Sequence, residues 1–297
     1  MVKVDHPGTS AEWHIRAMRR ACGRSYVRRM TTTETFQIPP EVAEIYESKF
    51  VPGIFAEWAP HILDVADVGA GDDVLDVACG TGIVARTARE RVGHTGTVTG
   101  VDLNEAMLAV ARRVAPEIDW RQGDVGALPF DDDSFDAVLC QMAFMFFADP
   151  TLALSQMARV ARQDATVAVV VPASLADQPA YGPLVDVAAR HAGPEAMSLL
   201  GTYWAAGDLD ELTRHFEAAG LDVVTTRTRT GTARFGSADE LVTTEVEGSP
   251  LRERLDDDTY ALIRQEAGQA LEQFMAGPGN LEAPLVCHIV AGQPRPA

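Results

Sequence analysis

Along most of this chain, short continuous runs of apolar residues alternate with segments in which apolar residues recur at helical spacing. Short apolar runs at 74–78, 97–101 and 166–171 are followed by segments with apolar residues at helical spacing, such as 83–92. The short runs are typical of buried strands, and the periodic segments are typical of helices that cover a sheet. Strands and helices in alternation predict βαβ units and therefore an α/β fold with a mostly parallel, doubly wound sheet.

The same patterns predict the rest of the architecture. Apolar residues between 40 and 63 are spaced as in a helix, and Pro52-Gly53 is expected to divide this stretch into two helices. After Pro172 the alternation stops, and we expect helical lid or acceptor-binding insertions at about 176–215 and 237–275. The other expected elements are strands at 118–122, 135–141 and 285–290, a helix after Pro150, a helix and strand within 216–230, and a loop at 277–284.

Charge separates the N-terminus from the rest. The 297-residue chain has a net charge of −18, yet residues 1–29 hold seven Lys or Arg against two Asp or Glu. We therefore predict a basic N-terminal extension without fixed structure over 1–35, followed by one domain over 36–297. An acidic surface repels phosphate backbones and anionic lipids, which argues against nucleic acid and membranes as partners.

Cysteine usage indicates a reducing compartment. The four cysteines at 22, 79, 140 and 287 are far apart and form no CxxC pair, so neither a disulfide framework nor a zinc site is expected. No apolar run reaches the roughly 18 residues of a membrane helix. The N-terminus also lacks the apolar segment of a secretory leader. We therefore expect a cytoplasmic protein with no bound metal.

The chemistry is concentrated in the run from Asp76 to Gly82, at the end of the first predicted strand. Gly80 and Gly82 permit a tight turn and close approach of a ligand to the backbone, and the following helix start offers free N–H groups. With Ala85 and Asp102, the run also fits a dinucleotide-binding pattern. Asp76 argues against that alternative, because an acid beside the loop would repel a pyrophosphate but would attract a cationic ligand.

The block Val74–Gly82 resembles the first motif of class I S-adenosylmethionine-dependent methyltransferases. The segments 100–104, 122–130 and 134–138 resemble the second, third and fourth strands of that family, in the same order and spacing. The closest similarity is to the small-molecule branch, including quinone-biosynthesis-type enzymes, and is specific over about residues 72–171. It implies a Rossmann-like sheet of seven strands and S-adenosylmethionine as cofactor.

The resemblance also implies roles for single residues. Asp76 and the backbone around Ala78, Gly80 and Gly82 would hold the methionine end of the cofactor, and Gln141 would lie near it. Asp102 would accept both ribose hydroxyls, because a carboxylate has enough lone pairs to do so. Leu103 would pack on the adenine, Asp124 would accept its amino group, and the N–H of Val125 would donate to the ring. Asp124 could instead cap a turn, and Gln141 could satisfy strand-end backbone.

The acceptor is expected beyond the carboxyl ends of the strands. Its walls would come from apolar and aromatic residues of the leading helices, the segment after the fourth strand and the insertions. The candidates are Tyr46, Phe144, Phe146, Tyr181 and Trp204. Part of this set is expected to be ordinary core. No catalytic residue is identified: His191 and His215 could deprotonate a hydroxyl, but a lone His is more often structural.

Three functions remain open at this stage. The first is methyl transfer to a small, largely apolar or aromatic acceptor at an O, C or N atom. The second is a protein or nucleic-acid methyltransferase, which the acidic charge and the lack of an Asn/Asp-Pro-Pro-Tyr/Phe motif disfavour. The third is a protein of the same fold that binds the cofactor without methylating. The sequence indicates neither the acceptor's identity nor the oligomeric state.

Overall fold

A computed structural model describes residues 39–249 and 251–296. The predicted basic extension, 1–35, lies outside the described residues. No helix within the described ranges is long and apolar enough to cross a membrane.

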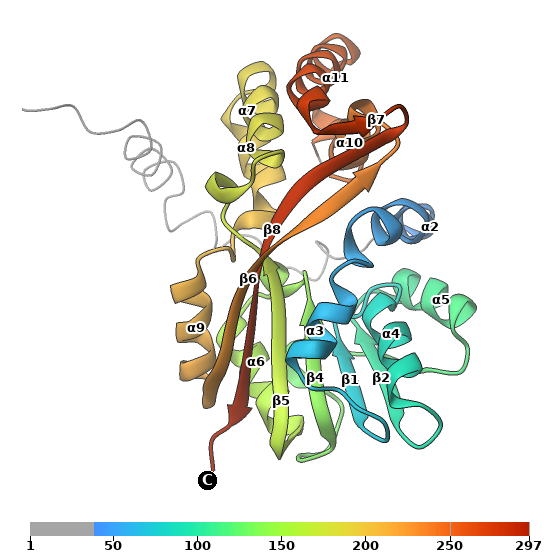
Figure 1. The fold of residues 1–297 in the computed structure, drawn as a ribbon, viewed down its shortest axis with the longest axis vertical. Helices are drawn as coiled ribbons and strands as arrows, with labels where there is room; N and C mark the ends of the chain where they lie inside the picture. The colour runs from blue at the N-terminus through green and yellow to red at the C-terminus, as the bar shows by residue number, and fades with distance from the viewer. Residues whose placement is uncertain (1–38, 250, 297) are drawn as a thin grey trace, which may run out of the picture. The chain divides into compact units, whose positions relative to one another are not determined.

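One mixed sheet forms the centre of the fold, with strand order β3-β2-β1-β4-β5-β8-β6 (Figure 1). β1 to β5 are parallel to one another, and β8 is antiparallel to β5 and β6. The predicted mostly parallel, doubly wound α/β fold is confirmed. A short eighth strand, β7, adds to the seven expected by pairing with β8 where a loop was predicted. The strands are β1 (Asp73–Val77), β2 (Thr97–Asp102), β3 (Asp119–Gln122), β4 (Phe135–Gln141), β5 (Ala161–Pro172), β6 (Leu221–Phe235), β7 (Met275–Gly277) and β8 (Asn280–Pro294).

Helices cover both faces of this sheet. On one face, α3 (Ala59–Val65), α4 (Ile83–Val92) and α5 (Glu105–Val114) pack on one set of strand side chains; on the other, α6 (Pro150–Val160) and α9 (Leu209–Ala218) pack on the alternate set. β1 shows the alternation: Val74 belongs to the first core and Leu75 and Val77 to the second. Strands buried on both faces read as continuous apolar runs, which explains the sequence pattern.

β6 and β8 are fifteen residues each, about twice as long as β1 to β4 or more, and continue past the sheet as an antiparallel ribbon. In Figure 1 two helical groups lie side by side along the upper part of this ribbon, at the positions of the predicted lid insertions. The first group is η6 (Leu175–Asp177), α7 (Tyr181–Ala192), α8 (Pro194–Leu200) and η7 (Gly201–Trp204); the second is α10 (Ala238–Glu247), η8 (Arg252–Arg254), α11 (Asp257–Leu271) and η9 (Glu272–Phe274). The first insertion was predicted to reach residue 215, but α9 packs on the sheet through Leu212 and Phe216.

A buried glutamine fastens the first lid segment to the ribbon. Gln178 is 3% exposed, and its amide nitrogen donates to the carbonyls of Ala173 and Val286 while its amide oxygen accepts the N–H of Val286. Because every polar atom of this side chain is used, the lid's connection to β5 and β8 is fixed at this point.

The leading segment departs from its prediction at Pro52-Gly53. Instead of two helices separated at this dipeptide, α2 (Pro40–Ile45) continues into a π-helix, η3 (Tyr46–Phe55), that contains both residues. In a π-helix each backbone N–H bonds to the carbonyl five residues before it rather than four. Pro52 has no N–H to donate, and this changed hydrogen-bond pattern accommodates it within the helix. Gly53 is needed for packing, because a Cβ there would lie 3.0 Å from the carbonyl oxygen of Arg234 in β6.

Candidate functional site

The loop after β1 is held in an unusual backbone conformation. Ala78, Gly80 and Gly82 all have positive φ, at 54°, 56° and 89°. The N–H of Gly82 donates to the carbonyl of Cys79 at 2.8 Å, which closes the turn into α4. A non-glycine residue such as Ala78 in the left-handed region is strained, and such strain concentrates at functional sites. The turn predicted for the glycine run is therefore present.

Asp102 fastens this loop to the end of β2. One carboxylate oxygen accepts the N–H of Gly80 at 2.8 Å, and the other accepts the N–H of Asn104 at 2.8 Å. Burial raises the pKa of Asp102, and the backbone N–H bonds from Asn104 and Gly80 oppose that rise. Each oxygen keeps a second lone pair, so the carboxylate can still accept hydroxyl groups from a ligand.

Asp76, at the end of β1, is 2% exposed. One of its oxygens accepts the N–H of Ala85 at 3.0 Å, in the first turn of α4, where backbone donors lack helical partners. Burial, together with the charge of Asp102, raises the pKa of Asp76 to about 8. The N–H of Ala85 and, to a smaller extent, the charge of Arg86 lower this pKa; the Arg86 guanidinium also pairs with Glu47 at 2.8 Å. A cationic ligand would stabilise the ionised form of this buried acid.

Trp120, on β3, is a site residue that the sequence analysis missed. A Cβ on Gly82 or Gly100 would lie 2.2 or 2.3 Å from its indole ring, so the ring packs directly on the bare backbone of both glycines. The indole nitrogen donates to the carbonyl of Ala115 at 2.8 Å and fixes the ring's orientation. Gly82 therefore serves packing on this side as well as the turn. Gly100 precedes Asp102 by two residues, a pattern that could have indicated a close approach at this position.

Tyr46 packs against Gly80 of the glycine loop. A Cβ on Gly80 would lie 3.6 Å from the ring and the hydroxyl of Tyr46, which leaves room only for ordinary contact. The ring stacks on Phe55 with centroids 5.0 Å apart. Burial and the acidic groups of Tyr203, Asp102 and Asp76 raise the pKa of Tyr46, so these four residues share one region. Helical spacing placed Tyr46 among the predicted acceptor residues but could not place it over Gly80.

Three residues predicted for the adenine lie at the ends of β2 and β3. Leu103 is 37% exposed, a high value for a large apolar side chain. Asp124 is exposed and accepts the N–H of Gly126 at 2.8 Å, as the cap of a short helix, η4 (Val125–Ala127). The structure therefore realises the turn-capping alternative, and the second carboxylate oxygen can accept another donor. Val125 is half-buried beside this cap.

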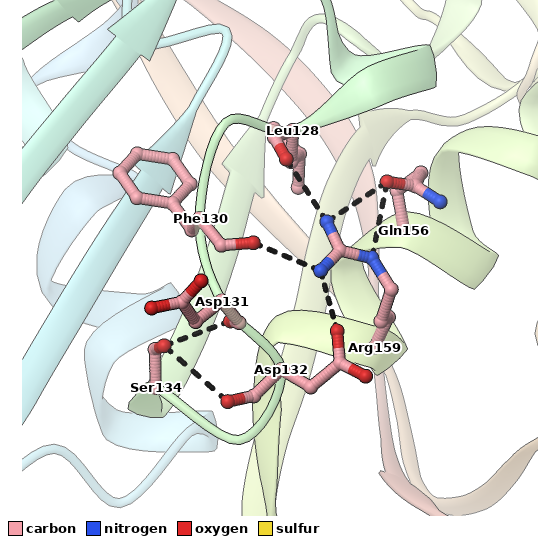
Figure 2. Close-up of polar contacts among 7 residues, drawn as sticks. All are labelled: Leu128, Phe130, Asp131, Asp132, Ser134, Gln156 and Arg159. Carbon is pink, nitrogen blue, oxygen red and sulfur yellow. Dashed lines mark hydrogen bonds and ion pairs between the residues drawn. The ribbon is translucent and has the colours of Figure 1, made fainter.

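The loop after η4 is held by one arginine (Figure 2). Arg159 of α6 donates to the carbonyls of Phe130 and Leu128 at 2.8 and 2.9 Å and pairs with Asp132 at 2.6 Å. Its Nε and one terminal nitrogen also donate to the side-chain oxygen of Gln156. This planar fork fixes the chain that follows Asp124, so the backbone near the predicted adenine position is rigidly supported.

Gln141 ends β4, next to β1. Its side-chain nitrogen donates to the carbonyl of Phe55 at 3.0 Å, and its buried side-chain oxygen has no hydrogen-bond partner among the described residues. Met142 follows with a φ of 52°, so β1 and β4 both end in a left-handed, non-glycine residue. The sequence left open that Gln141 only satisfies backbone groups at the strand end. Its side-chain nitrogen does so, but its side-chain oxygen remains available to accept a hydrogen bond from a ligand.

The predicted acceptor residues divide into two groups. Phe144 and Trp204 are 2% and 9% exposed, and Tyr181 packs on Trp204 at a tilt, with centroids 4.9 Å apart, so these three are largely core. Phe146, in η5 (Phe144–Phe146), is half-buried and meets Tyr203 edge to face, with centroids 5.5 Å apart. Tyr203 was not predicted, because residues 201–204 show no periodic pattern.

The charges at this site constrain what it can hold. Asp76 and Asp102 bring two buried carboxylates to the same loop, and the described residues contain no group of His, Cys, Asp and Glu arranged to hold a metal. The three cysteines in the described ranges are free thiols. A small cation with hydroxyl groups fits the two acids and the bare Gly80 backbone, whereas a pyrophosphate would be repelled.

Comparison with known proteins identifies the family to which this site belongs. A family model described as a methyltransferase domain matches residues 75–169. Nocamycin O-methyltransferase of Saccharothrix syringae is 33% identical over 279 residues, which cover 86% of this chain and 97% of that protein. The ubiquinone/menaquinone biosynthesis C-methyltransferase UbiE of Xanthomonas oryzae pv. oryzae is 38% identical over 114 residues, which are 36% of this chain and 45% of that protein.

A solved structure shows the same fold. The crystal structure of the YcgJ protein from Bacillus subtilis aligns with a TM-score of 0.54 at 22% identity, covering 81% of this chain and 99% of that one. At this level of identity the similarity concerns the architecture alone.

Proposed function

The chain belongs to the S-adenosylmethionine-dependent methyltransferases, and from this premise we propose that its acceptor is a small, largely apolar or aromatic molecule. One observation supports this most directly. Tyr46, Phe146 and Tyr203 come from three separate elements and are each half-buried; Tyr46 contacts Gly80 of the glycine loop, and Phe146 meets Tyr203 edge to face. An acceptor between these rings would bind mainly by burial of apolar area, at about 25 cal/mol per Å².

Cofactor binding is proposed to use the residues at the strand ends. Asp76, the backbone from Ala78 to Gly82, and Gln141 would hold the methionine end, with the ammonium group near the carboxylate of Asp76. The Asp102 carboxylate, already oriented by two N–H bonds, would accept the ribose hydroxyls. Leu103, Asp124 and Val125 would surround the adenine. The exposed face of Leu103 and the free oxygen of Asp124 support these two roles.

S-adenosylmethionine supplies an activated methyl group, so the protein's work is alignment and exclusion of water. The Gly80 backbone and Asp102 fix the cofactor on one side, and Tyr46, Phe146 and Tyr203 bound the space on the other. Holding two reactants in a productive geometry supplies a large part of the rate. The lid helices on the β6–β8 ribbon close this space, and a dry site strengthens the electrostatic interactions within it.

One observation favours a hydroxyl acceptor over the other atoms. The O-methyltransferase of Saccharothrix syringae matches 86% of this chain, so its similarity includes lid residues, whereas the C-methyltransferase matches 36%. Of the proposed acceptor rings, Tyr203 belongs to the predicted lid, whereas Tyr46 and Phe146 do not. A small acceptor, rather than a protein, is supported by the half-buried placement of the rings.

Methyl transfer from S-[methyl-³H]adenosylmethionine to separate pools of phenols, quinols, amines and proteins tests the proposal. We expect label in a phenol or quinol. Labelling of proteins alone would contradict a small acceptor. Cofactor binding without transfer to any pool would support a cofactor-binding protein that does not methylate.

A further inference from the structure

A small cavity lies between η5, the residues that follow η7, the start of α6, and α9. Its volume is about 120 Å³, and it is partly open to solvent. None of the residues predicted to hold the cofactor lines it. Six apolar residues form most of its wall: Phe144, Met145, Pro150, Ala205, Ala206 and Leu212.

Two polar side chains complete this wall, and both come from α9. Glu211 and His215 are four residues apart, so they lie on the same face of the helix. The Nδ1 of His215 lies 2.8 Å from the hydroxyl oxygen of Thr151, and the imidazole meets the Phe144 ring edge to face. These two contacts orient the imidazole. Within residues 39–249 and 251–296, neither its Nε2 nor the Glu211 carboxylate has a hydrogen-bond or ion-pair partner.

The size of the cavity restricts what it can hold. Sites for drug-sized ligands measure roughly 300–1,000 Å³, whereas an apolar cavity of about 150 Å³ takes a benzene ring. At about 120 Å³ and partly open, this cavity has room for a single ring whose substituent points toward the mouth. Water alone is poorly suited to it, because six of the eight lining residues are apolar and ordered water needs polar partners.

Charge restricts the ligand further. The lining includes one acid and neither Lys nor Arg, so a carboxylate or phosphate would be repelled. An ionised carboxylate only accepts hydrogen bonds, and a neutral imidazole can accept one, so a ligand with an N–H or O–H group satisfies Glu211 and His215. The wall therefore favours a monocyclic molecule that carries an amine or a hydroxyl.

The cavity adjoins the two segments that carry acceptor rings. Phe144 and Met145 belong to η5, as does Phe146. Ala205 follows Tyr203 by two residues. Phe146 and Tyr203 meet edge to face, with centroids 5.5 Å apart, which joins the two segments. A molecule in the cavity would contact both segments at once and hold them together.

We propose that this cavity is a second binding site, that it takes a small monocyclic amine or alcohol, and that the bound molecule promotes methyl transfer by bracing η5 against the end of η7. The ring lies against the apolar wall, with its donor toward Glu211 and the Nε2 of His215. Rigidity gained from one ligand lowers the ordering cost of the next, so binding here strengthens acceptor binding. Only this effect on transfer rests on the proposed function.

A titration of the full chain, without cofactor and followed by ligand-observed NMR, tests the site. The probes are benzylamine, benzyl alcohol and benzoate, which at neutral pH are a cation, a neutral molecule and an anion. We expect benzylamine and benzyl alcohol to bind at least about tenfold more tightly than benzoate, because the anion meets Glu211 and brings no donor.

Two variants locate the binding in this cavity. Ala206→Leu fills it and should weaken both ligands by at least about tenfold, whereas Ala218→Leu, at an exposed position of α9, should not. Glu211→Gln should weaken benzylamine by about two- to fivefold, as expected for an exposed ion pair, and leave benzyl alcohol nearly unchanged. Glu217→Gln, an exposed acid of the same helix outside the cavity, is its control. Because Glu211 is exposed, this variant still tests the site if Ala206→Leu fails to fold.

The effect on transfer is measured with S-[methyl-³H]adenosylmethionine and the pool of phenols at limiting concentration. Products are extracted into organic solvent from acid, which leaves any methylated benzylamine in the water. Saturating benzylamine should raise the initial rate of the wild type by at least about twofold and should not change that of Ala206→Leu.

The outcomes separate the site from the proposed function. Absence of benzylamine binding, or binding that Ala206→Leu leaves unchanged, would overturn the site. Binding that lowers the transfer rate would show that the cavity holds part of the acceptor itself, which overturns a separate site. Binding without a change in rate would overturn the bracing alone. If the wild type transfers to no small acceptor, the proposed function fails, and the binding titration still decides the site.

Discussion

The Asp102 carboxylate accepts a hydrogen bond from the backbone N–H of Gly80 at 2.8 Å, which ties the end of β2 to the loop after β1. Twenty-two residues separate the two in sequence, and parallel pairing of β1 with β2 brings them together. Asp102 therefore holds the glycine loop in place, and in the proposed function it would also bind the ribose of the cofactor.

Replacing Asp102 with alanine is expected to weaken S-adenosylmethionine binding by about 10- to 150-fold, the equivalent of roughly 1.5–3 kcal/mol. It should also lower the free energy of unfolding by about 1–3 kcal/mol, because the N–H groups of Gly80 and Asn104 lose their acceptor. Calorimetry and denaturant unfolding measure the two effects. Asp131→Ala, in the exposed loop before β4, is the control. Wild-type cofactor affinity in Asp102→Ala would show that this acid does not contact the ribose.

Asp76 predicts a pH dependence of cofactor binding. Its pKa is raised from 3.8 to about 8, so most molecules carry the proton at neutral pH, and a cation binds the ionised form. Affinity should therefore rise by up to about tenfold per pH unit below 8. Measurements between about pH 6 and 7.5 avoid loss of the cofactor's own ammonium charge, which begins near 8. Asp76→Asn should bind weakly with a flat profile; a sloped profile in this variant would assign the titration to another group.

The same raised pKa affects the ligand-free fold in the opposite direction. Because folding takes up a proton at Asp76, the stability that this residue contributes is lost as pH rises from about 4 to about 8. We expect the ligand-free wild type to lose stability relative to Asp76→Asn across this window. Denaturant midpoints at several pH values measure the difference, and parallel curves for the two proteins would contradict it.

The contact of Trp120 with Gly100 predicts a strong packing effect. A Cβ at Gly100 would lie 2.3 Å from the indole, so Gly100→Ala should destabilise by about 1–3 kcal/mol through overpacking. Trp120→Leu should relieve the clash, so the double variant should lose less stability than the two single changes together. Gly268→Ala, on α11 with open space around it, should be neutral or slightly stabilising. Thermal unfolding compares all four variants, and additive losses would exclude direct contact.

Phe146 and Trp204 are expected to respond differently to truncation. Phe146 is half-buried beside Tyr203, so Phe146→Ala should raise the acceptor KM while cofactor affinity stays nearly unchanged. Trp204 is 9% exposed and packs against Tyr181, so Trp204→Ala should cost about 3–5 kcal/mol of stability. Phe130→Ala removes a half-buried ring that packs on Phe135 and not on Tyr203, and serves as control for loss of a ring. An unchanged acceptor preference in a destabilised Phe146→Ala would place this ring in the core.

Local patterns were sufficient to predict the parallel strands, the turn after β1 and the acids at the strand ends. The apolar runs mark strands buried on both faces, and a carboxylate directly after such a run must lie at the same sheet edge as its neighbours. Asp76, Asp102 and Gln141 could be placed together for this reason. The expected roles of these residues toward the cofactor remain predictions.

Long-range packing decided the rest, because the sequence carries no local record of it. Nothing near Trp120 in the chain shows that its ring covers Gly82 and Gly100, and the break expected at Pro52-Gly53 became a π-helix that packs on β6. Burial and the charge of Asp102 raise the pKa of Asp76, and both depend on segments that only the folded chain brings together. The sequence by itself therefore determined the parallel strands, through their apolar runs, and the acids that directly follow those strands. Tertiary structure alone decided which side chains close the site, because desolvation and contact are properties of the assembled fold.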